Sequence, residues 1–135
     1  MLGAMCESTL HTVTHSVIEI DGARATSESY FLATHSIAAN ESAIEQWFGP
    51  AYLAEQREAG TLDRRHEYIC MGRYLDELER RDGKWRIARR QITNEWATSR
   101  PEQRVTEGVP GAFSVRGLRD RRDPAYRMLT TPGTR

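Results

Sequence analysis

The chain has 135 residues, with 19 Lys and Arg against 19 Asp and Glu, so its formal net charge is zero. No global field therefore draws it to nucleic acid or to an anionic membrane surface, and the length suits one domain with a real core. We expect a single domain over residues 1–135, with no nucleic-acid partner and no membrane partner.

Apolar runs and cysteines exclude further classes. No run approaches the roughly 20 apolar residues of a membrane helix. The N-terminus also lacks the basic segment and long apolar run of a secretory signal. Cys6 and Cys70 are too few and too far apart for a disulfide framework or a metal knuckle. We therefore expect a cytoplasmic protein with two reduced thiols and no metal site.

Residues 10–37 have the pattern of a β-hairpin. Residues 10–20 carry spaced apolar side chains, and residues 24–37 are rich in Thr, Ser, Tyr and Phe. Asp21-Gly22 lies between the two runs, and both residue types tolerate the positive φ of tight turns. The sequence predicts two antiparallel strands here.

The period of the apolar residues changes over residues 40–60. Ser42 and Glu45 have capping-box spacing, and Gly49-Pro50 breaks the run so that Pro50 can open a second helix. Gly60 supplies a stop signal. We predict a helical insertion between the second and third strands.

A second hairpin is predicted over residues 65–96, around Asp82-Gly83, with Tyr, Trp and Ile as strand-forming side chains. After Trp96 the composition changes to scattered Pro and Gly. We therefore expect an irregular C-terminal tail over residues 97–135.

His11 and His35 are the best candidates for proton transfer, because imidazole titrates near neutrality. If the first turn uses three residues, Asp21 to Ala23, then His11 lies opposite Ala33, and His35 is its diagonal neighbour at roughly 5–8 Å. A two-residue turn would put the two histidines on opposite faces. In the three-residue register the same face also carries His15, Val13 and Phe31.

Other polar residues have weaker assignments. Arg89 and Arg90 are neighbours on a strand, so one points inward, where it needs either a carboxylate partner or an anionic ligand. Asn94 is placed to orient a water or a carbonyl, and His66, which follows two arginines, is predicted at the surface. The possible carboxylate partners of the inward arginine are Asp76, Glu77 and Glu95.

The chain shows no nucleophile motif, no phosphate-binding glycine loop and no cluster of metal-ligating residues. This pattern disfavours nucleotide hydrolysis, acyl-enzyme chemistry and zinc catalysis. We expect cofactor-independent acid–base chemistry on a neutral or weakly polar organic molecule.

Two segments, LHTVTHSVIEIDGARATSESYFLATH and GRYLDELERRDGKWRIARRQITNEW, together with the tail RGLRDRRDPAYRML, resemble SnoaL-like proteins of the NTF2-like superfamily. That group includes scytalone dehydratases, bile-acid 7α-dehydratases and ketosteroid isomerases. The resemblance covers roughly residues 9–37 and 65–129. It implies an α+β cone in which helices close a highly curved antiparallel sheet, usually in a dimer.

The resemblance also implies roles for individual residues. His11 falls where the dehydratase members have a general base or acid, and His35 corresponds to a second polar residue near the end of the following strand. Arg90 matches an arginine of the last strand, which favours it over Arg89 as the inward one. His15 stands where an asparagine is often seen. Because family members begin with helices that bring a tyrosine and an aspartate into the pocket, we expect that the N-terminal helical part is truncated here.

These observations predict a small-molecule dehydratase or isomerase, a lyase-type or isomerase-type enzyme that works beside a carbonyl without a cofactor. The expected ligand is a small hydrophobic organic molecule, and the expected assembly is a homodimer or homo-oligomer. Two alternatives remain open: a non-catalytic NTF2-like ligand-binding or dimerisation module, and a polyketide-cyclase-like protein. The expected catalytic residues are His11 and His35, and the expected substrate-binding residues are Arg90, Asn94, His15, Phe31 and Val13.

Overall fold

A computed structural model describes residues 5–112, 117–118 and 120–129. The chain divides into two compact units. The hairpin unit comprises Thr9–His35 and Glu67–Arg100, and the helical unit comprises the described parts of Met1–Ser8, Ser36–His66 and Pro101–Arg135. The expectation of one domain over the whole chain stays a prediction.

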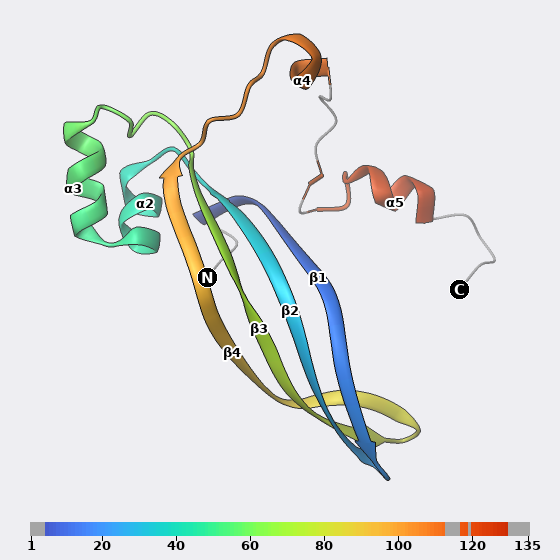
Figure 1. The fold of residues 1–135 in the computed structure, drawn as a ribbon. Helices are drawn as coiled ribbons and strands as arrows, with labels where there is room; N and C mark the ends of the chain where they lie inside the picture. The colour runs from blue at the N-terminus through green and yellow to red at the C-terminus, as the bar shows by residue number, and fades with distance from the viewer. Residues whose placement is uncertain (1–4, 113–116, 119, 130–135) are drawn as a thin grey trace. The chain divides into compact units, whose positions relative to one another are not determined.

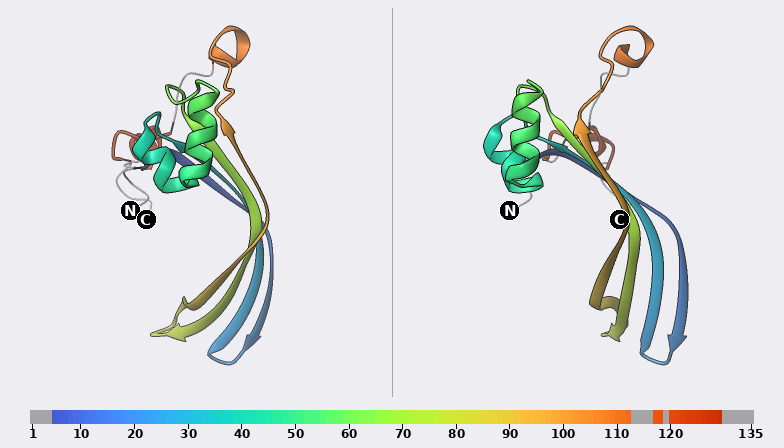
Figure 2. Two further views of the ribbon diagram at one scale, coloured as in Figure 1. Left: turned by 90° about the vertical axis from the view of Figure 1, so that its left-hand side faces the viewer. Right: turned by 60° about the vertical axis from the view of Figure 1, so that its left-hand side comes forward.

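Four long strands form one antiparallel sheet in the order β1-β2-β3-β4 (Figure 1). Each strand pairs with its sequence neighbour, and the pairs β1-β2 and β3-β4 are hairpins. Figure 2 shows that the strands twist and bend together along the hairpin unit. Together with the short helices this confirms the predicted α+β, NTF2-like fold class. The strands are β1 (Cys6–Asp21), β2 (Arg24–Ile37), β3 (His66–Arg81) and β4 (Lys84–Pro101).

Both hairpins close through two residues. Asp82 and Gly83 join β3 to β4 with φ values of 52° and 76°, the positive pair that a type I′ turn needs. Between β1 and β2 the loop is Gly22 and Ala23, with Gly22 at φ 57°. Of the two turn lengths that the sequence left open, the three-residue turn beginning at Asp21 does not occur, because Asp21 lies in the strand.

The register of β1 against β2 changes along the strand. Ser16 hydrogen-bonds Ser29 at 2.6 Å, while further along His11 lies against His35. Ser29 and His35 are an even number of residues apart, so they lie on the same face of β2. Their partners on β1, Ser16 and His11, are five residues apart and would lie on opposite faces if β1 were regular. His15 lies beside Tyr30, on the face opposite Ser29, so the strand is regular from His15 onward. An irregularity of the β-bulge kind therefore lies between His11 and His15.

Two short helices connect β2 to β3, as the sequence predicts. In α2 (Glu41–Phe48) the Asn40 side chain caps the first turn by accepting from the Ala43 N–H at 2.9 Å, so the predicted cap at Ser42 was wrong. Gly49, at φ 88°, ends α2, and Pro50 begins α3 (Pro50–Glu58). The apolar face of α2 packs in a cluster whose buried members are Cys6, Ile37 and Ala43.

β4 continues to Pro101, so the irregular tail begins later than the predicted residue 97. The extension is held by its partner strand: Arg100 hydrogen-bonds and ion-pairs with Glu67 of β3. Two short helices follow, α4 (Gly108–Ala112) and α5 (Pro124–Leu129). Within the described residues no helix is long and apolar enough to cross a membrane.

Candidate functional site

One face of the hairpin unit has a buried aromatic floor. Phe31 and Tyr74 stack with ring centroids 4.4 Å apart at 16°, and both are less than a tenth exposed. Alternation along β3 puts every second side chain of the segment Tyr68 to Asp76 on this face. The buried members of the floor are Phe31, Ala33, Cys70 and Tyr74, with Tyr68 packed against them.

His11 and His35 meet over this floor. Their ring centroids are 5.1 Å apart and the rings are nearly perpendicular, at 78°. His35 is 8% exposed, and its ring lies 5.8 Å from that of Tyr68, whereas His11 is exposed. The predicted proximity is therefore present, although it arises from the irregularity in β1 rather than from a three-residue turn. The catalytic role of the pair stays a prediction.

Tyr74 links the floor to the histidines. Its hydroxyl lies 3.3 Å from Nδ1 of His11, and its ring stacks on Phe31. The Arg90 guanidinium carbon lies 4.1 Å from the centroid of the same ring, a cation–π distance. The Tyr74 ring therefore has an aromatic and a cationic neighbour while its hydroxyl reaches an imidazole.

Arg90 is the arginine on this face. Its Nε and Nη2 donate to the two carboxylate oxygens of Asp76, each at 2.7 Å, and the Asp76 side chain is only 6% exposed. These hydrogen bonds raise the pKa of Arg90 above its usual value, so the group stays charged. Arg89 instead pairs with Glu77, and both of those side chains are more than half exposed.

The remaining predicted residues divide into two groups. Asn94 donates to the Tyr68 hydroxyl at 3.1 Å, and Phe31 is part of the floor. Val13 is about half exposed and lies outside the buried cluster.

Cys70 on β3 also belongs to the floor, although it was not among the predicted site residues. Burial raises the pKa of its thiol, and a hydrogen bond from Tyr68 lowers that pKa in part.

The predicted position of His15 on the same face was wrong. Its ring stacks on Tyr30 with centroids 5.1 Å apart, and Tyr30 neighbours Phe31 on β2 and so points the other way. The irregularity in β1 separates His15 from His11, because it shifts the alternation between them by one residue.

The surface position predicted for His66 was also wrong. In the helical unit this side chain is fully buried, with Nδ1 2.9 Å from the Tyr52 hydroxyl and Nε2 3.1 Å from the Thr61 carbonyl oxygen. Burial lowers the pKa of His66, helped by the nearby charge of Arg64. Burial also raises the pKa of Tyr52 to about 12, with a further contribution from Glu55.

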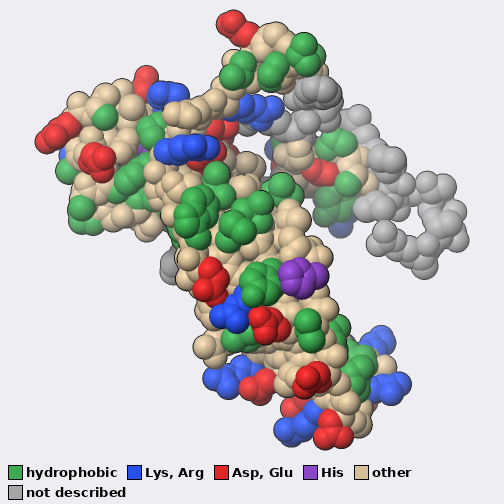
Figure 3. Space-filling model, viewed as in Figure 1, with side chains coloured by type: hydrophobic (Ala, Val, Ile, Leu, Met, Phe, Trp, Pro, Cys, Tyr) green, Lys and Arg blue, Asp and Glu red, His purple; other side chains and the backbone are tan. Residues whose placement is uncertain are grey.

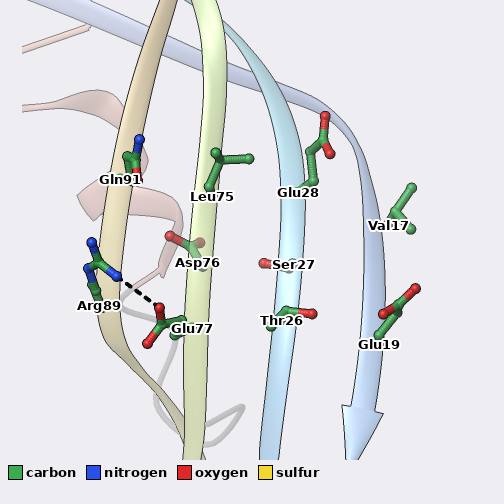
Figure 4. A pocket seen from close by; sticks show the side chains of 10 residues that line it. All are labelled: Val17, Glu19, Thr26, Ser27, Glu28, Leu75, Asp76, Glu77, Arg89 and Gln91. Atoms are coloured by element: carbon green, nitrogen blue, oxygen red, sulfur yellow. Dashed lines mark hydrogen bonds and ion pairs between the residues drawn. The ribbon is translucent and has the colours of Figure 1, made fainter.

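The opposite face of the hairpin unit carries a groove of about 420 Å³ (Figure 4). Three glutamates line it, and Arg89 pairs with one of them, Glu77. In Figure 3, apolar and charged side chains are interspersed on the visible surface of the sheet. The groove is lined by neither His11 nor His35, so this hollow and the histidine pair are separate features. Its lining residues are Val17, Glu19, Thr26, Ser27, Glu28, Leu75, Asp76, Glu77, Arg89 and Gln91.

Sequence reasoning missed Tyr68 and Tyr74 as members of the site. The signal was present as a period of two in β3, which places Tyr68, Cys70, Gly72 and Tyr74 on one face. Gly72 fits this arrangement, because a Cβ there would lie 1.9 Å from the Thr93 carbonyl oxygen. Close backbone approach at Gly72 thus brings β3 and β4 together beneath the site.

Comparisons with known proteins agree with this fold. The chain is similar to the Kfla4162 protein of Kribbella flavida (25% identity, TM-score 0.50, covering 72% of this chain and 52% of that one). It is also similar to a candidate scytalone dehydratase of Novosphingobium aromaticivorans (21%, TM-score 0.51, 71% and 49%). A third similar structure is the hexachlorocyclohexane dehydrochlorinase LinA type 2 (17%, TM-score 0.50, 81% and 57%).

This chain therefore spans about half the length of these solved structures. No curated protein matches it. The model of the SnoaL-like domain matches residues 1–91, which is more than half of the chain. The protein belongs to the SnoaL-like domain family.

Proposed function

We propose that the protein acts as a small-molecule dehydratase or isomerase that uses the two imidazoles of His11 and His35 for acid–base chemistry beside a carbonyl. The observation that carries this proposal is the edge-on meeting of the two rings, 5.1 Å apart, over an aromatic floor. Family membership and the dehydratase and dehydrochlorinase names of two similar folds support the same class of chemistry.

The proposed reaction needs one group to take a proton and another to stabilise or protonate an oxygen. One imidazole removes the proton next to the carbonyl, and the carbonyl oxygen accepts the electron pair. The electrons then form the new double bond as the β-hydroxyl leaves, and the hydroxyl takes a proton to become water. In the isomerase variant the same proton returns to a different carbon. The carbonyl is the electron sink, so this chemistry calls for no cofactor.

The floor favours an apolar ligand. The stacked rings of Phe31 and Tyr74 form an apolar base with Tyr68 packed against it, and Asn94 and the histidines add a few polar atoms around it. A small hydrophobic molecule with one carbonyl matches this combination. We further propose that the protein is cytoplasmic and that it acts as a homodimer.

A direct test follows β-hydroxy ketones and β,γ-unsaturated ketones, whose products are conjugated enones that absorb in the ultraviolet. We expect His11→Ala and His35→Ala each to slow enone formation by about 10²- to 10⁴-fold, the usual contribution of a general acid or base. His15→Ala is the matched control, because His15 lies on the other face, and its rate should stay within twofold. An unchanged rate in His11→Ala would overturn the proposal.

A binding or dimerisation module is a second candidate, favoured by exposed apolar side chains on β1 and β4. Val17, Ile20, Ile87 and Ile92 are each about half or more exposed. Exposed apolar side chains on the two edge strands of a sheet offer contact area to a partner. Ligand binding with full affinity in His11→Ala, together with no turnover in the wild type, would favour this module over the enzyme, whereas a dimer seen by light scattering fits both candidates.

A further inference from the structure

We propose that Tyr74 is a positioning residue for His11, and that the Asp76–Arg90 pair holds Tyr74 in this role. The inference rests on the proposed function, because it concerns the same histidine pair. Under this proposal Arg90 orients Tyr74 instead of binding substrate, and His11 and His35 have different roles in the reaction.

The Tyr74 ring is fixed on more than one side. Phe31 stacks on it at 4.4 Å, the Arg90 guanidinium lies over it at 4.1 Å, and the side chain is only 9% exposed. A tyrosine has two side-chain torsions, so these contacts leave its hydroxyl little freedom. The hydroxyl therefore meets Nδ1 of His11 at a defined point, 3.3 Å away.

Arg90 is itself held by Asp76. Two parallel hydrogen bonds of 2.7 Å occupy Nε and Nη2, and Asp76 is buried, so the planar guanidinium has one orientation. A guanidinium whose fork is used in this way is placed to act on the Tyr74 ring rather than to bind a substrate oxygen. Arg90 thus acts through Tyr74.

The cation over the ring also sets the direction of the hydrogen bond. A positive charge on the ring face draws electron density from the phenol, which makes its hydroxyl a better donor. Tyr74 then donates to Nδ1 of His11, so the neutral imidazole carries its proton on Nε2. No described residue hydrogen-bonds that nitrogen, and the His11 ring is exposed.

The consequence is a division of roles. His11 presents its Nε2–H to a substrate oxygen and stabilises the negative charge that develops there, as a neutral imidazole can. His35 takes the proton from carbon and returns it to the leaving hydroxyl or to the product carbon. The proton that His35 takes from carbon thus leaves again on water or on the product, and the electron pair of the broken C–H bond becomes the new double bond.

The tautomer of His11 is measured by long-range ¹H–¹⁵N correlation spectroscopy of the full chain, without substrate. We expect the Nε2–H tautomer in the wild type and a mixture of both tautomers in Tyr74→Phe. Tyr30→Phe is the matched control, since Tyr30 stacks on His15, and it should leave the His11 signals unchanged. A wild-type Nδ1–H tautomer, or an unchanged tautomer in Tyr74→Phe, overturns the inference. Neither result depends on turnover, so the inference can fail while His11→Ala still abolishes activity.

Arg90→Gln separates positioning from substrate binding. We expect kcat to fall about tenfold with KM within twofold, together with the same mixed tautomers of His11. Arg89→Gln, which breaks only the exposed pair with Glu77, should change neither. Arg90→Lys, which keeps the charge but loses the planar fork, should give the same result and serves if Arg90→Gln does not fold. A raised KM with an unchanged tautomer would show that Arg90 binds substrate and would contradict the inference.

Discussion

Each unit of the molecule contains a histidine bonded to a tyrosine, and the two pairs differ in what surrounds them. In the helical unit, His66 is fully buried and both of its nitrogens are occupied, by Tyr52 and by the Thr61 carbonyl. In the hairpin unit, His11 is exposed and is bonded by Tyr74 at Nδ1. The same two side-chain types thus build a closed pair and an open pair.

The difference separates a structural histidine from a chemically available one. His66 has no nitrogen left for a ligand, and its burial disfavours the charged form. It therefore connects β3 to α3 and to the loop at Thr61. His11 keeps one nitrogen accessible next to a second imidazole, and the proposed acid–base chemistry depends on that nitrogen. A histidine–tyrosine contact alone indicates neither role.

The largest expected contrast is in stability. His66→Leu keeps a similar volume but removes the partner of the partly buried Tyr52 hydroxyl and one of the two donors to the Thr61 carbonyl, which still accepts from the Arg64 N–H. We therefore expect a loss of about 2–3 kcal/mol in the free energy of unfolding. His11→Leu should cost less than about 1 kcal/mol, because water can satisfy Tyr74 at that exposed position. Urea denaturation of both variants measures the contrast, and equal losses would contradict it.

The tyrosines should show the same contrast on a smaller scale. Tyr52→Phe removes the donor to the buried Nδ1 of His66, and we expect a cost of about 1–2 kcal/mol. Tyr74→Phe should cost under about 1 kcal/mol, since its partner is open to solvent. Thermal and urea unfolding of the two variants check this order. A reversed order would mean that the open pair is the structural one.

A third effect depends on pH. The folded-state pKa of His66 lies below the unfolded value of about 6.5, so the unfolded chain binds a proton that the folded chain does not. The free energy of unfolding should therefore fall as pH drops below about 6.5, by at most about 1.4 kcal/mol per pH unit from this group. Urea titrations between pH 7 and 5.5 measure the slope. His66→Leu should flatten it, and an equally steep slope in that variant would refute the assignment.

The sheet was predictable because its signals are local. The bounds of β2 agree with the predicted strand, and Asp82-Gly83 forms the predicted tight turn. The sequence also predicts helices on both sides of Gly49-Pro50. These features depend on periodicity and turn chemistry over a few residues, which one sequence contains.

The faces of the residues were harder to predict. The position of His15 depends on an irregularity between His11 and His15, and no residue type in that segment predicts it. A register shift of one residue moves every later side chain of the strand to the opposite face of the sheet. His66 follows two arginines in sequence, yet both of its partners, Tyr52 and Thr61, come from the segment before β3. Such tertiary partners override local polarity.

Arg90 lies between these cases. Strand alternation required one of Arg89 and Arg90 to point inward, and Asp76 was among its possible partners. Only the structure shows that Asp76 occupies the guanidinium fork and that Tyr74 lies beneath it. Strand alternation therefore picks out this pair of arginines, while the role of Arg90 depends on tertiary neighbours that alternation does not predict.

The central claim is that His11 and His35 work as one unit. A double-mutant cycle of enone formation with His11→Ala, His35→Ala and the double variant tests it, with His15→Ala as control. Groups that act together are strongly non-additive, so we expect the double variant to be no slower than the slower single variant. Losses that multiply in the double variant, or a single variant at the wild-type rate, would contradict the account.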